Sequence, residues 1–348
     1  MRYDCLEIDK FVSKLEKKGD VYIFNRPESE EIYNLMWKKQ AKRHAGKKEK
    51  TSDEWGRNRV FLLNMLCGRP IDFLNQATIL DACSGLGRFS IASLEKRAKF
   101  VISYDGSYNG LQSTSDRIRE RNAPENYNEK GGLGLASPQA RPSDNNAPPD
   151  VYEPLVKLKD IKNLHRRHIS IQGDMENIRS FFDKANLKVD AVIHNMALQH
   201  TRDPAKTLSD LHNVLVPQGM LMLNFFREGT TPQITYDFRE RFLPLPPQLV
   251  FDAIEAIEGL EEKDINSVLN CLKKEKYLPV LNEFLSLSQK YSFKQIIDTL
   301  HFEDLQTPYL HNIDYYSVRS FIQEHLKMKI ANEFDVGAGQ VGIMCAVK

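Results

Sequence analysis

The stretch ILDACSGLGRFS, residues 79–90, decides which fold is expected of this chain. Its first half is a short apolar run that ends at Asp81, as a buried β-strand does, and its second half has helical spacing. Between them lies a turn that contains Gly85 and Gly87. Glycines allow a ligand to approach the backbone closely, and the first turn of a helix presents free N–H groups. This arrangement predicts a ligand site where a strand passes into a helix.

Strand-like and helical segments alternate on both sides of this turn. The strand-like runs are short and mostly apolar, and they lie at residues 99–105, 168–174, 189–195 and 220–226. Segments with helical spacing separate most of them, which is typical of β-α-β units on a parallel sheet. We therefore expect an α/β fold built on a parallel sheet.

Composition divides the chain into a core and three additions. Residues 1–76 are expected to be helical and polar, and residues 122–165 are rich in Pro, Gly, Asn and Ser. The second of these segments cannot bury enough apolar surface to offset chain entropy, so we expect a largely disordered insertion. Residues 228–312 show repeated helical patterns without strand alternation, which predicts a helical subdomain after the fifth strand. The core then comprises residues 77–227 and 313–348, which end in two strand-like runs.

The overall composition excludes several classes of protein. Hydrophobic residues make up 41% of the 348 residues and charged residues 27%, as in ordinary globular proteins. The net charge of +1 argues against charge-driven binding to nucleic acid, and no apolar run reaches the roughly 18 residues of a membrane span. The chain starts without an apolar signal segment, and its 5 cysteines form no closely spaced pair. We therefore expect no disulfide framework, no metal site and a reducing, cytoplasmic location.

The residues around the glycine turn narrow the choice of nucleoside ligand. Asp105 ends the next strand, at the position where an acid accepts hydrogen bonds from ribose hydroxyls. A phosphate-binding loop needs Lys after its last glycine, whereas Arg88 stands there. A dinucleotide-binding turn needs a third glycine where this chain has Ser90. A nucleoside triphosphatase is therefore disfavoured, and NAD or FAD binding is the minor interpretation.

Four segments, in order along the chain, resemble the class I S-adenosylmethionine-dependent methyltransferases. Residues 79–90 resemble the family's first, glycine-containing motif, and residues 101–111 resemble its ribose-binding acid motif. Residues 171–178 resemble the motif whose Asp lies beside adenine, and residues 189–223 resemble the fourth strand with the helix and helix-to-strand turn after it. The resemblance implies a Rossmann-like sheet of seven strands, the last antiparallel, and S-adenosylmethionine as cofactor. It also implies that the helical subdomain at 228–312 is a lid over a small acceptor.

Two positions depart from the family's pattern. Cys83 stands where the first glycine of the motif usually lies, and Gln218 replaces a glycine of the later helix-to-strand turn. Cys83 could narrow the space beside the methionine part of the cofactor. It is expected to be a small packing residue rather than a nucleophile, because no His lies near it in the sequence. Gly85 and Gly87 remain, so the expectation of a cofactor site stands.

The resemblance implies cofactor-binding roles for residues in all four segments. Asp81 would organise the loop of the first motif and face the methionine amino group. Four further residues would form the loop under the methionine part of the cofactor: Cys83, Ser84, Gly85 and Gly87. Two acids would accept hydrogen bonds from the ribose and the adenine amino group, and two neighbours would pack beside the adenosine: Asp105, Asp174, Gly106 and Met175. Two residues at the end of the fourth strand would flank the sulfonium: Asn195 and Met196.

Each of these assignments has a structural alternative. Asp81 could cap the turn that comes after it, and Asp105 and Asp174 could be ordinary loop acids. Met175 and Met196 could be core residues, which is the commoner use of Met. Either acid alone is weak evidence for a cofactor site. Together they favour it, because their order along the chain matches the motif.

The sequence indicates less about the residues that would bind the methyl acceptor. Methyl transfer from a sulfonium depends mainly on aligning the acceptor, and it needs a base only where the acceptor must lose a proton. The sequence NMAL at 195–198 is not of the NPPY type, which argues against methylation of base amines in nucleic acid. The candidates for acceptor contacts are Tyr309, His311 and His200, and for each of them packing is the alternative role.

Three functions compete. The leading one is in-line methyl transfer to a small-molecule acceptor. The second changes the acceptor to RNA or protein, and its support is a basic cluster that we otherwise interpret as a solvated helix face: Lys38, Lys39, Lys42, Arg43, Lys47, Lys48 and Lys50. The third is a nucleoside-binding protein of the same fold that has lost catalysis. The sequence leaves the oligomeric state open.

Overall fold

The computed structural model describes residues 5–44, 76–122, 164–226, 228, 232–260, 264–300, 302–336 and 341–348. The insertion expected at 122–165 falls almost wholly outside these residues. The last part of the basic cluster, Lys47, Lys48 and Lys50, also lies outside them. Both expectations therefore remain predictions.

One mixed sheet runs through the described part of the chain. Its nine strands there follow the order β1-β2-β5-β4-β3-β6-β7-β9-β8. The strands of the core are β3 (Thr78–Ala82), β4 (Phe100–Asp105), β5 (His168–Gln172), β6 (Val189–Asn195), β7 (Leu215–Phe226), β8 (Lys329–Val336) and β9 (Val341–Val347). Those from β3 to β7 are parallel, and β9 enters antiparallel between β7 and β8. This confirms the expected Rossmann-like sheet with an antiparallel last strand.

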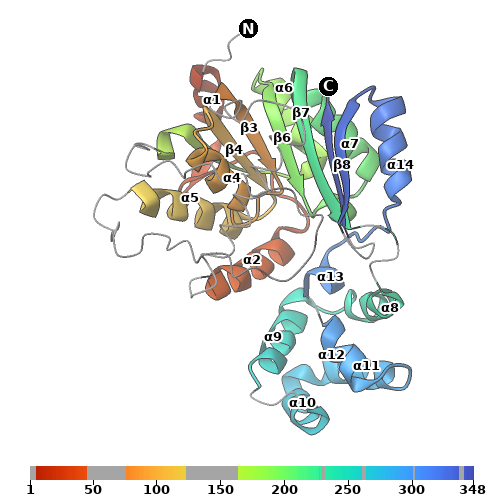
Figure 1. Cartoon of the computed structure of the whole chain (residues 1–348). Coiled ribbons are helices and arrows are strands. Elements are labelled where there is room, and N and C mark those ends of the chain that lie inside the picture. The colour runs from red at the N-terminus through yellow and green to blue at the C-terminus, as the bar shows by residue number, and fades with distance from the viewer. Residues whose placement is uncertain are drawn as a thin grey trace, which may run out of the picture.

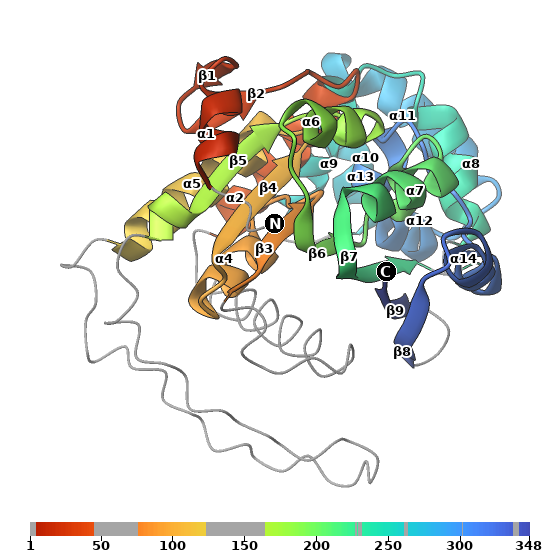
Figure 2. The same ribbon diagram turned by 90° about the horizontal axis from the view of Figure 1, so that it is seen from above.

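The sheet differs from the expectation at one edge (Figure 2). A hairpin of β1 (Glu16–Lys18) and β2 (Val21–Ile23) precedes the core, and β2 pairs in parallel with β5. The expected seven strands are therefore nine, and the helical expectation for residues 1–76 is wrong at residues 16–23. Each strand has only three residues, too few for an alternating pattern to stand out in the sequence. Gly19, with φ +57°, provides the tight turn between them.

Helices cover both faces of this sheet (Figure 1). One face carries α1 (Cys5–Val12), α6 (Ile178–Lys184), α7 (Pro204–Val214) and α14 (Tyr315–Ser320). The other face carries α4 (Arg88–Glu95) and α5 (Tyr108–Asn122). Along β3, Leu80 and Ala82 belong to the first core and Ile79 to the second, as the period-two alternation of a strand requires.

A helical subdomain comes after β7, as predicted. Its helices are α8 (Gln233–Phe242), α9 (Pro247–Glu258), α10 (Ile265–Leu272), α11 (Leu278–Ser288), α12 (Phe293–Thr299) and α13 (Phe302–Gln306). They share a core of their own, in which Phe238, Phe242 and Phe284 are buried. Figure 1 shows them gathered at one end of the sheet. None of the helices described, here or in the core, is long and apolar enough to cross a membrane.

The N-terminal helix α2 (Glu30–His44) joins the sheet layers to this subdomain (Figure 1). Leu35 lies in the core of the subdomain. Asn34, next to it, accepts hydrogen bonds from the Ser107 hydroxyl at 2.9 Å and from the N–H of Asn109 at 3.0 Å, at the start of α5. Neighbouring residues of one helix are therefore fixed to two different parts of the molecule.

An ion pair strengthens the attachment of α2 to the subdomain. Lys39 is only 8% exposed, and its Nζ lies 2.9 Å from a carboxylate oxygen of both Glu255 and Glu258 on α9. The interpretation of the basic cluster as a solvated face is therefore wrong for Lys39. Its stem packs between two elements, and its charge is matched by acids far away in the sequence, which no local pattern reveals.

Candidate active site

A cavity of about 670 Å³ opens at the carboxyl ends of the central parallel strands. This is where a doubly wound sheet places its ligand, and the volume suits a small-molecule site. Most of the residues singled out in the sequence line it: Asp81, Cys83, Ser84, Asp105, Gly106, Asp174, Met175, Asn195, Met196, His200 and Tyr309. Gly85, Gly87 and His311 are not among the lining residues.

Backbone shape in the glycine turn explains its two glycines. Gly85 has φ +54° and Gly87 has φ +69°, a region that side chains disfavour. A Cβ on Gly85 would lie 2.4 Å from the ring of Trp37, and one on Gly87 would lie 2.2 Å from Thr114. Both glycines thus make room for protein side chains of α2 and α5.

The two residues that replace glycines of the family's pattern also adopt a positive φ. Cys83 has φ +60° and Gln218 has φ +66°. A left-handed conformation costs a non-glycine residue roughly 1–2 kcal/mol, which the surrounding structure must offset. At Cys83 the N–H donates to the carbonyl oxygen of Tyr104 at 2.8 Å. The turn therefore retains its form although the first glycine is replaced.

Asp81 holds the start of the helix after the turn. Its Oδ2 accepts hydrogen bonds from the backbone N–H of Ser90 at 2.8 Å and from the Ser90 hydroxyl at 2.6 Å. The side chain is 2% exposed, and burial raises the pKa of Asp81 to about 7. The capping role considered for Asp81 is thus present, while Asp81 also lines the cavity.

Asp105 closes the glycine turn against the next strand. Its two carboxylate oxygens accept hydrogen bonds from the N–H of Gly85 at 2.9 Å and of Ser107 at 2.8 Å. Burial raises the pKa of Asp105 to about 6, although these two hydrogen bonds act to lower it. A carboxylate has about four acceptor sites, so capacity remains for donors that enter the cavity.

Asp174 lies just beyond β5 at a similar position. It caps the short helix η5 (Met175–Asn177) by accepting a hydrogen bond from the N–H of Glu176 at 3.0 Å. Its own N–H donates to Asn25 at 3.1 Å, which ties the N-terminal segment to the site. Met175 is 8% exposed and packs in the core, so the core role considered for it is present beside its contact with the cavity.

Two asparagines meet at the ends of β6 and β7. The Nδ2 of Asn224 donates to Oδ1 of Asn195 at 2.8 Å, and the N–H of Met196 donates to the backbone oxygen of Asn224 at 2.6 Å. Among the described residues, Oδ1 of Asn224 and Oγ of Ser84 are buried without a hydrogen-bond partner. Such orphaned polar atoms are costly, and both residues line the cavity, so they are groups that a polar ligand would satisfy.

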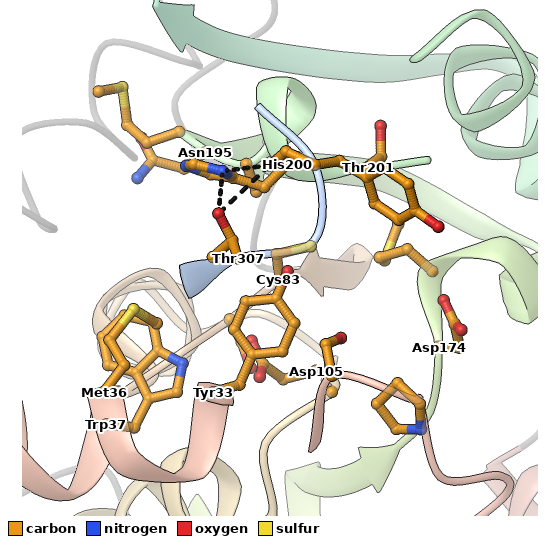
Figure 3. Close-up of a pocket in the computed structure, with 18 of the residues that line it drawn as sticks. Tyr33, Met36, Trp37, Cys83, Asp105, Asp174, Asn195, His200, Thr201 and Thr307 are labelled. Carbon is orange, nitrogen blue, oxygen red and sulfur yellow. Dashed lines mark hydrogen bonds between the residues drawn. The ribbon is translucent and has the colours of Figure 1, made fainter. Parts of the chain in front are cut away.

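Sequence reasoning missed the wall that α2 contributes. Four of its residues line the cavity at positions i, i+3, i+4 and i+7: Tyr33, Met36, Trp37 and Gln40. Figure 3 shows the ring of Tyr33 next to Cys83 and Asp105, with Met36 and Trp37 to one side of it. Burial, reinforced by the nearby Cys83 and Asp105, raises the pKa of Tyr33 well above its usual range. The helical spacing was a usable signal, but nothing local indicates that this face lies over the glycine turn.

The chain returns from the helical subdomain through residues 307–311, which we call the return segment. It runs beside residues 199–202: the N–H of His311 donates to the oxygen of Gln199 at 2.8 Å, and Nε2 of His311 donates to the oxygen of Thr201 at 2.8 Å. Of the two candidates in this segment, only Tyr309 lines the cavity. His311 instead fastens the segment, so the acceptor contact expected of it is not formed from this position.

The subdomain itself covers less of the cavity than a lid would. Of the described residues between 228 and 312, only Thr307, Pro308 and Tyr309 line it. The helices from α8 to α13 use their apolar faces on one another and on α2. The described subdomain therefore acts on the cavity through α2 and the return segment.

Comparisons with known proteins give a family model and several solved structures. Residues 149–223 match a family model described as a methyltransferase domain. Magnesium protoporphyrin IX methyltransferase from Synechocystis PCC 6803, with bound SAH, is 13% identical, with 92% of this chain and 97% of that chain covered and a TM-score of 0.46. An O-methyltransferase family protein from Burkholderia thailandensis is 11% identical, with 88% and 61% covered and a TM-score of 0.38.

A third structure, PKMT2 from Rickettsia typhi in complex with AdoHcy, is 10% identical, with 82% of this chain and 52% of that chain covered and a TM-score of 0.43. A comparison with curated proteins gives no match.

The strand order and the glycine turn define a Rossmann-like α/β protein with a cavity at the switch point of its sheet. Within this fold, residues 149–223 match a methyltransferase domain, so the chain is similar to S-adenosylmethionine-dependent methyltransferases in that stretch.

Proposed function

We propose that the chain transfers a methyl group from S-adenosylmethionine to a small acceptor bound in the same cavity. The observation that carries the proposal is the continuity of this space. One cavity of about 670 Å³ is lined both by the residues expected to hold the cofactor and by His200, Thr307 and Tyr309 beside them. A donor and an acceptor held there would be close enough for direct transfer, which is the main requirement of this reaction.

The residues of the cavity fit the proposed cofactor. Asp105 and Asp174 offer carboxylate oxygens for ribose hydroxyls and the adenine amino group. Asp81 offers a carboxyl oxygen for the methionine ammonium, whose positive charge would favour the ionised form of this acid. The orphaned atoms, Oγ of Ser84 and Oδ1 of Asn224, would gain partners from a polar ligand. When bound, the cofactor would supply a methyl group activated by a positively charged sulfur.

The walls of the cavity favour a small acceptor. α2 forms one side, and at the mouth Arg202 lies 3.5 Å from Glu28 and donates a hydrogen bond to the Tyr309 hydroxyl at 2.8 Å. These contacts join three separate segments around the opening. Lys39, a member of the basic cluster, is paired with Glu255 and Glu258 and so is a poor phosphate contact.

The test is a transfer assay with S-adenosylmethionine labelled on the methyl group. The protein is incubated with a cell extract divided into deproteinised small molecules, RNA and protein. We expect label in the small-molecule fraction. Label in RNA or protein alone would contradict the small acceptor, and cofactor binding without transfer to any fraction would contradict the activity.

A variant in the basic cluster distinguishes an RNA acceptor from a small acceptor. Lys38 is exposed on α2, so Lys38→Gln should leave transfer unchanged at every salt concentration. An RNA acceptor would instead make transfer sensitive to salt and weaker in this variant, because fewer counterions are released on binding.

A further inference from the structure

The return segment fixes one nitrogen of the His200 ring. Nδ1 lies 3.1 Å from the carbonyl oxygen of Tyr309 and 3.3 Å from the hydroxyl oxygen of Thr307 (Figure 3). A carbonyl oxygen only accepts hydrogen bonds, so Nδ1 carries the ring proton. The Thr307 hydroxyl donates to the same carbonyl at 3.2 Å, which leaves its lone pair turned to Nδ1. This pair of contacts selects one tautomer of the neutral ring.

The opposite nitrogen, Nε2, is then the acceptor of the neutral ring. The His200 ring lines the cavity, and within the described residues no hydrogen bond to Nε2 is found. The charged and titratable groups that influence the ring are Arg239 on α8 and His311 in the return segment, both of which lower its pKa. Burial is the largest cause, and the pKa of His200 is lowered to about 4. The ring is therefore neutral near pH 7, with a free lone pair on Nε2.

We propose that His200 is the general base of the transfer and that the acceptor reacts through a hydroxyl group. This inference rests on the proposed function and names the class of its acceptor. A carboxylate is already ionised and needs no base, and an amine attacks with its own lone pair before it loses a proton. A hydroxyl is a weak nucleophile until its proton is removed, so it gains most from a lone pair held in the cavity wall.

In the transfer step the acceptor hydroxyl gains a methyl group and His200 takes up the hydroxyl proton. The hydroxyl oxygen of the acceptor forms the new bond to the methyl carbon, and its proton passes to Nε2 of His200. The carbon–sulfur bond breaks with its electron pair on sulfur, which becomes a neutral thioether. His200 then carries protons on both nitrogens, and the Tyr309 carbonyl accepts from the charged ring until a proton is lost to water.

Thr307 and the Tyr309 carbonyl act through His200, so we call them positioning groups. Both lie in the segment that leaves the helical subdomain. The subdomain would thus set the tautomer of the base without covering the acceptor. Thr307→Val removes the hydroxyl at nearly constant volume, and Thr307→Ser retains it.

The tautomer can be measured directly by nitrogen-15 NMR of the histidine rings in the full chain, with His200→Asn used to assign the signal. We expect His200 to be neutral and protonated on Nδ1 between pH 6 and 8, because its pKa is about 4. Thr307→Val should reduce the share of this tautomer, and Thr307→Ser should restore it. A ring protonated on Nε2, or a charged ring at pH 7, would overturn the proposal.

The acceptor class is tested with carbon-13 methyl-labelled S-adenosylmethionine and a deproteinised cell extract. The carbon-13 shift distinguishes a methyl ether from a methylamine, a thioether or an ester. We expect a methyl ether. His200→Asn should lower kcat by about 10²–10⁴-fold while cofactor affinity stays within a few-fold. His325→Asn, an exposed histidine far along the chain, serves as the matched control.

Different results would overturn the roles proposed for His200 and the hydroxyl acceptor and the methyltransferase function on which they rest. A labelled amine, thioether or ester would overturn the hydroxyl acceptor and leave the methyltransferase standing. Unchanged kcat in His200→Asn would overturn the base. A chain that binds no S-adenosylmethionine would contradict the proposed function itself. If His200→Asn fails to fold, Thr307→Val provides the assignment instead, because Thr307 contacts Nδ1 of His200 and its loss should change the signal of that ring.

Discussion

Burial gives Asp81 and Asp105 acid–base behaviour that their sequence positions do not reveal. Both side chains are at most 5% exposed, and burial raises their pKa values to about 7 and about 6. An unfolded Asp titrates near pH 4. The folded chain therefore holds protons between about pH 4 and 7 that the unfolded chain has released. In this window the free energy of unfolding should fall as pH rises.

Asp81→Asn tests this coupling. Asn retains an oxygen that can accept from Ser90 but cannot ionise, so the decline of stability between pH 5 and pH 8 should become shallower. Urea unfolding at the two pH values measures it, with Asp183→Asn on the exposed face of α6 as control. An equal decline in the unaltered chain and in Asp81→Asn would contradict the raised pKa of Asp81.

At this scale the sequence correctly predicted where the acids of the site gather. Asp81, Asp105 and Asp174 each lie at or just beyond the end of a parallel strand, and the carboxyl ends of such strands meet at one edge. Their hydrogen-bond donors were not predictable, because the N–H groups of Ser90, Gly85 and Glu176 reach them only once the turns have closed. His200 acquires its fixed tautomer from Tyr309, which lies over a hundred residues away.

At the scale of elements, α2 is the part of the site that a sequence pattern alone leaves out. Its Trp37 packs on the glycine turn so closely that a Cβ at Gly85 would lie 2.4 Å from the indole. The glycine is thus required by a helix from the N-terminal segment. This makes the fit between helix and turn directly measurable.

A double-mutant cycle measures that fit. Gly85→Ala should cost about 1–3 kcal/mol of unfolding free energy from overpacking against Trp37, in addition to the strain of φ +54°. In a Trp37→Ala background the space is open, so only the backbone strain should remain. Urea unfolding of the four variants gives the coupling free energy. Additive losses would contradict the contact between α2 and the turn.

The starts of some helices are set by residues close together in the sequence. Asp203 caps α7 with Pro204 at its first turn, and Ser292 and Gln295 form the capping box of α12. Such caps depend on neighbours within three residues, so the sequence carries them. The β1–β2 hairpin was missed because three-residue strands gain stability from pairing with β5, a contact between distant segments.

At the scale of the whole molecule, two distant segments complete a site whose floor is the sheet. Helix α2 precedes the core in the chain, and the return segment follows the helical subdomain. Both of them line the cavity. The order of strands and helices could be predicted because each has its own periodicity. The position of α2 over the cavity could not be predicted from the sequence. It depends on apolar packing between Leu35 and the subdomain and on the ion pairs of Lys39.

The central claim is that this cavity binds S-adenosylmethionine, and calorimetric titration of the full chain tests it most directly. We predict one molecule of S-adenosylmethionine bound per chain, displaced by S-adenosylhomocysteine. Asp105→Ala should weaken binding by about 1.5–3 kcal/mol, the range for hydrogen bonds to a charged group. Asp183→Ala should leave the affinity unchanged. Binding of NAD with no heat from either sulfur ligand, or equal affinity in Asp105→Ala, would contradict the account.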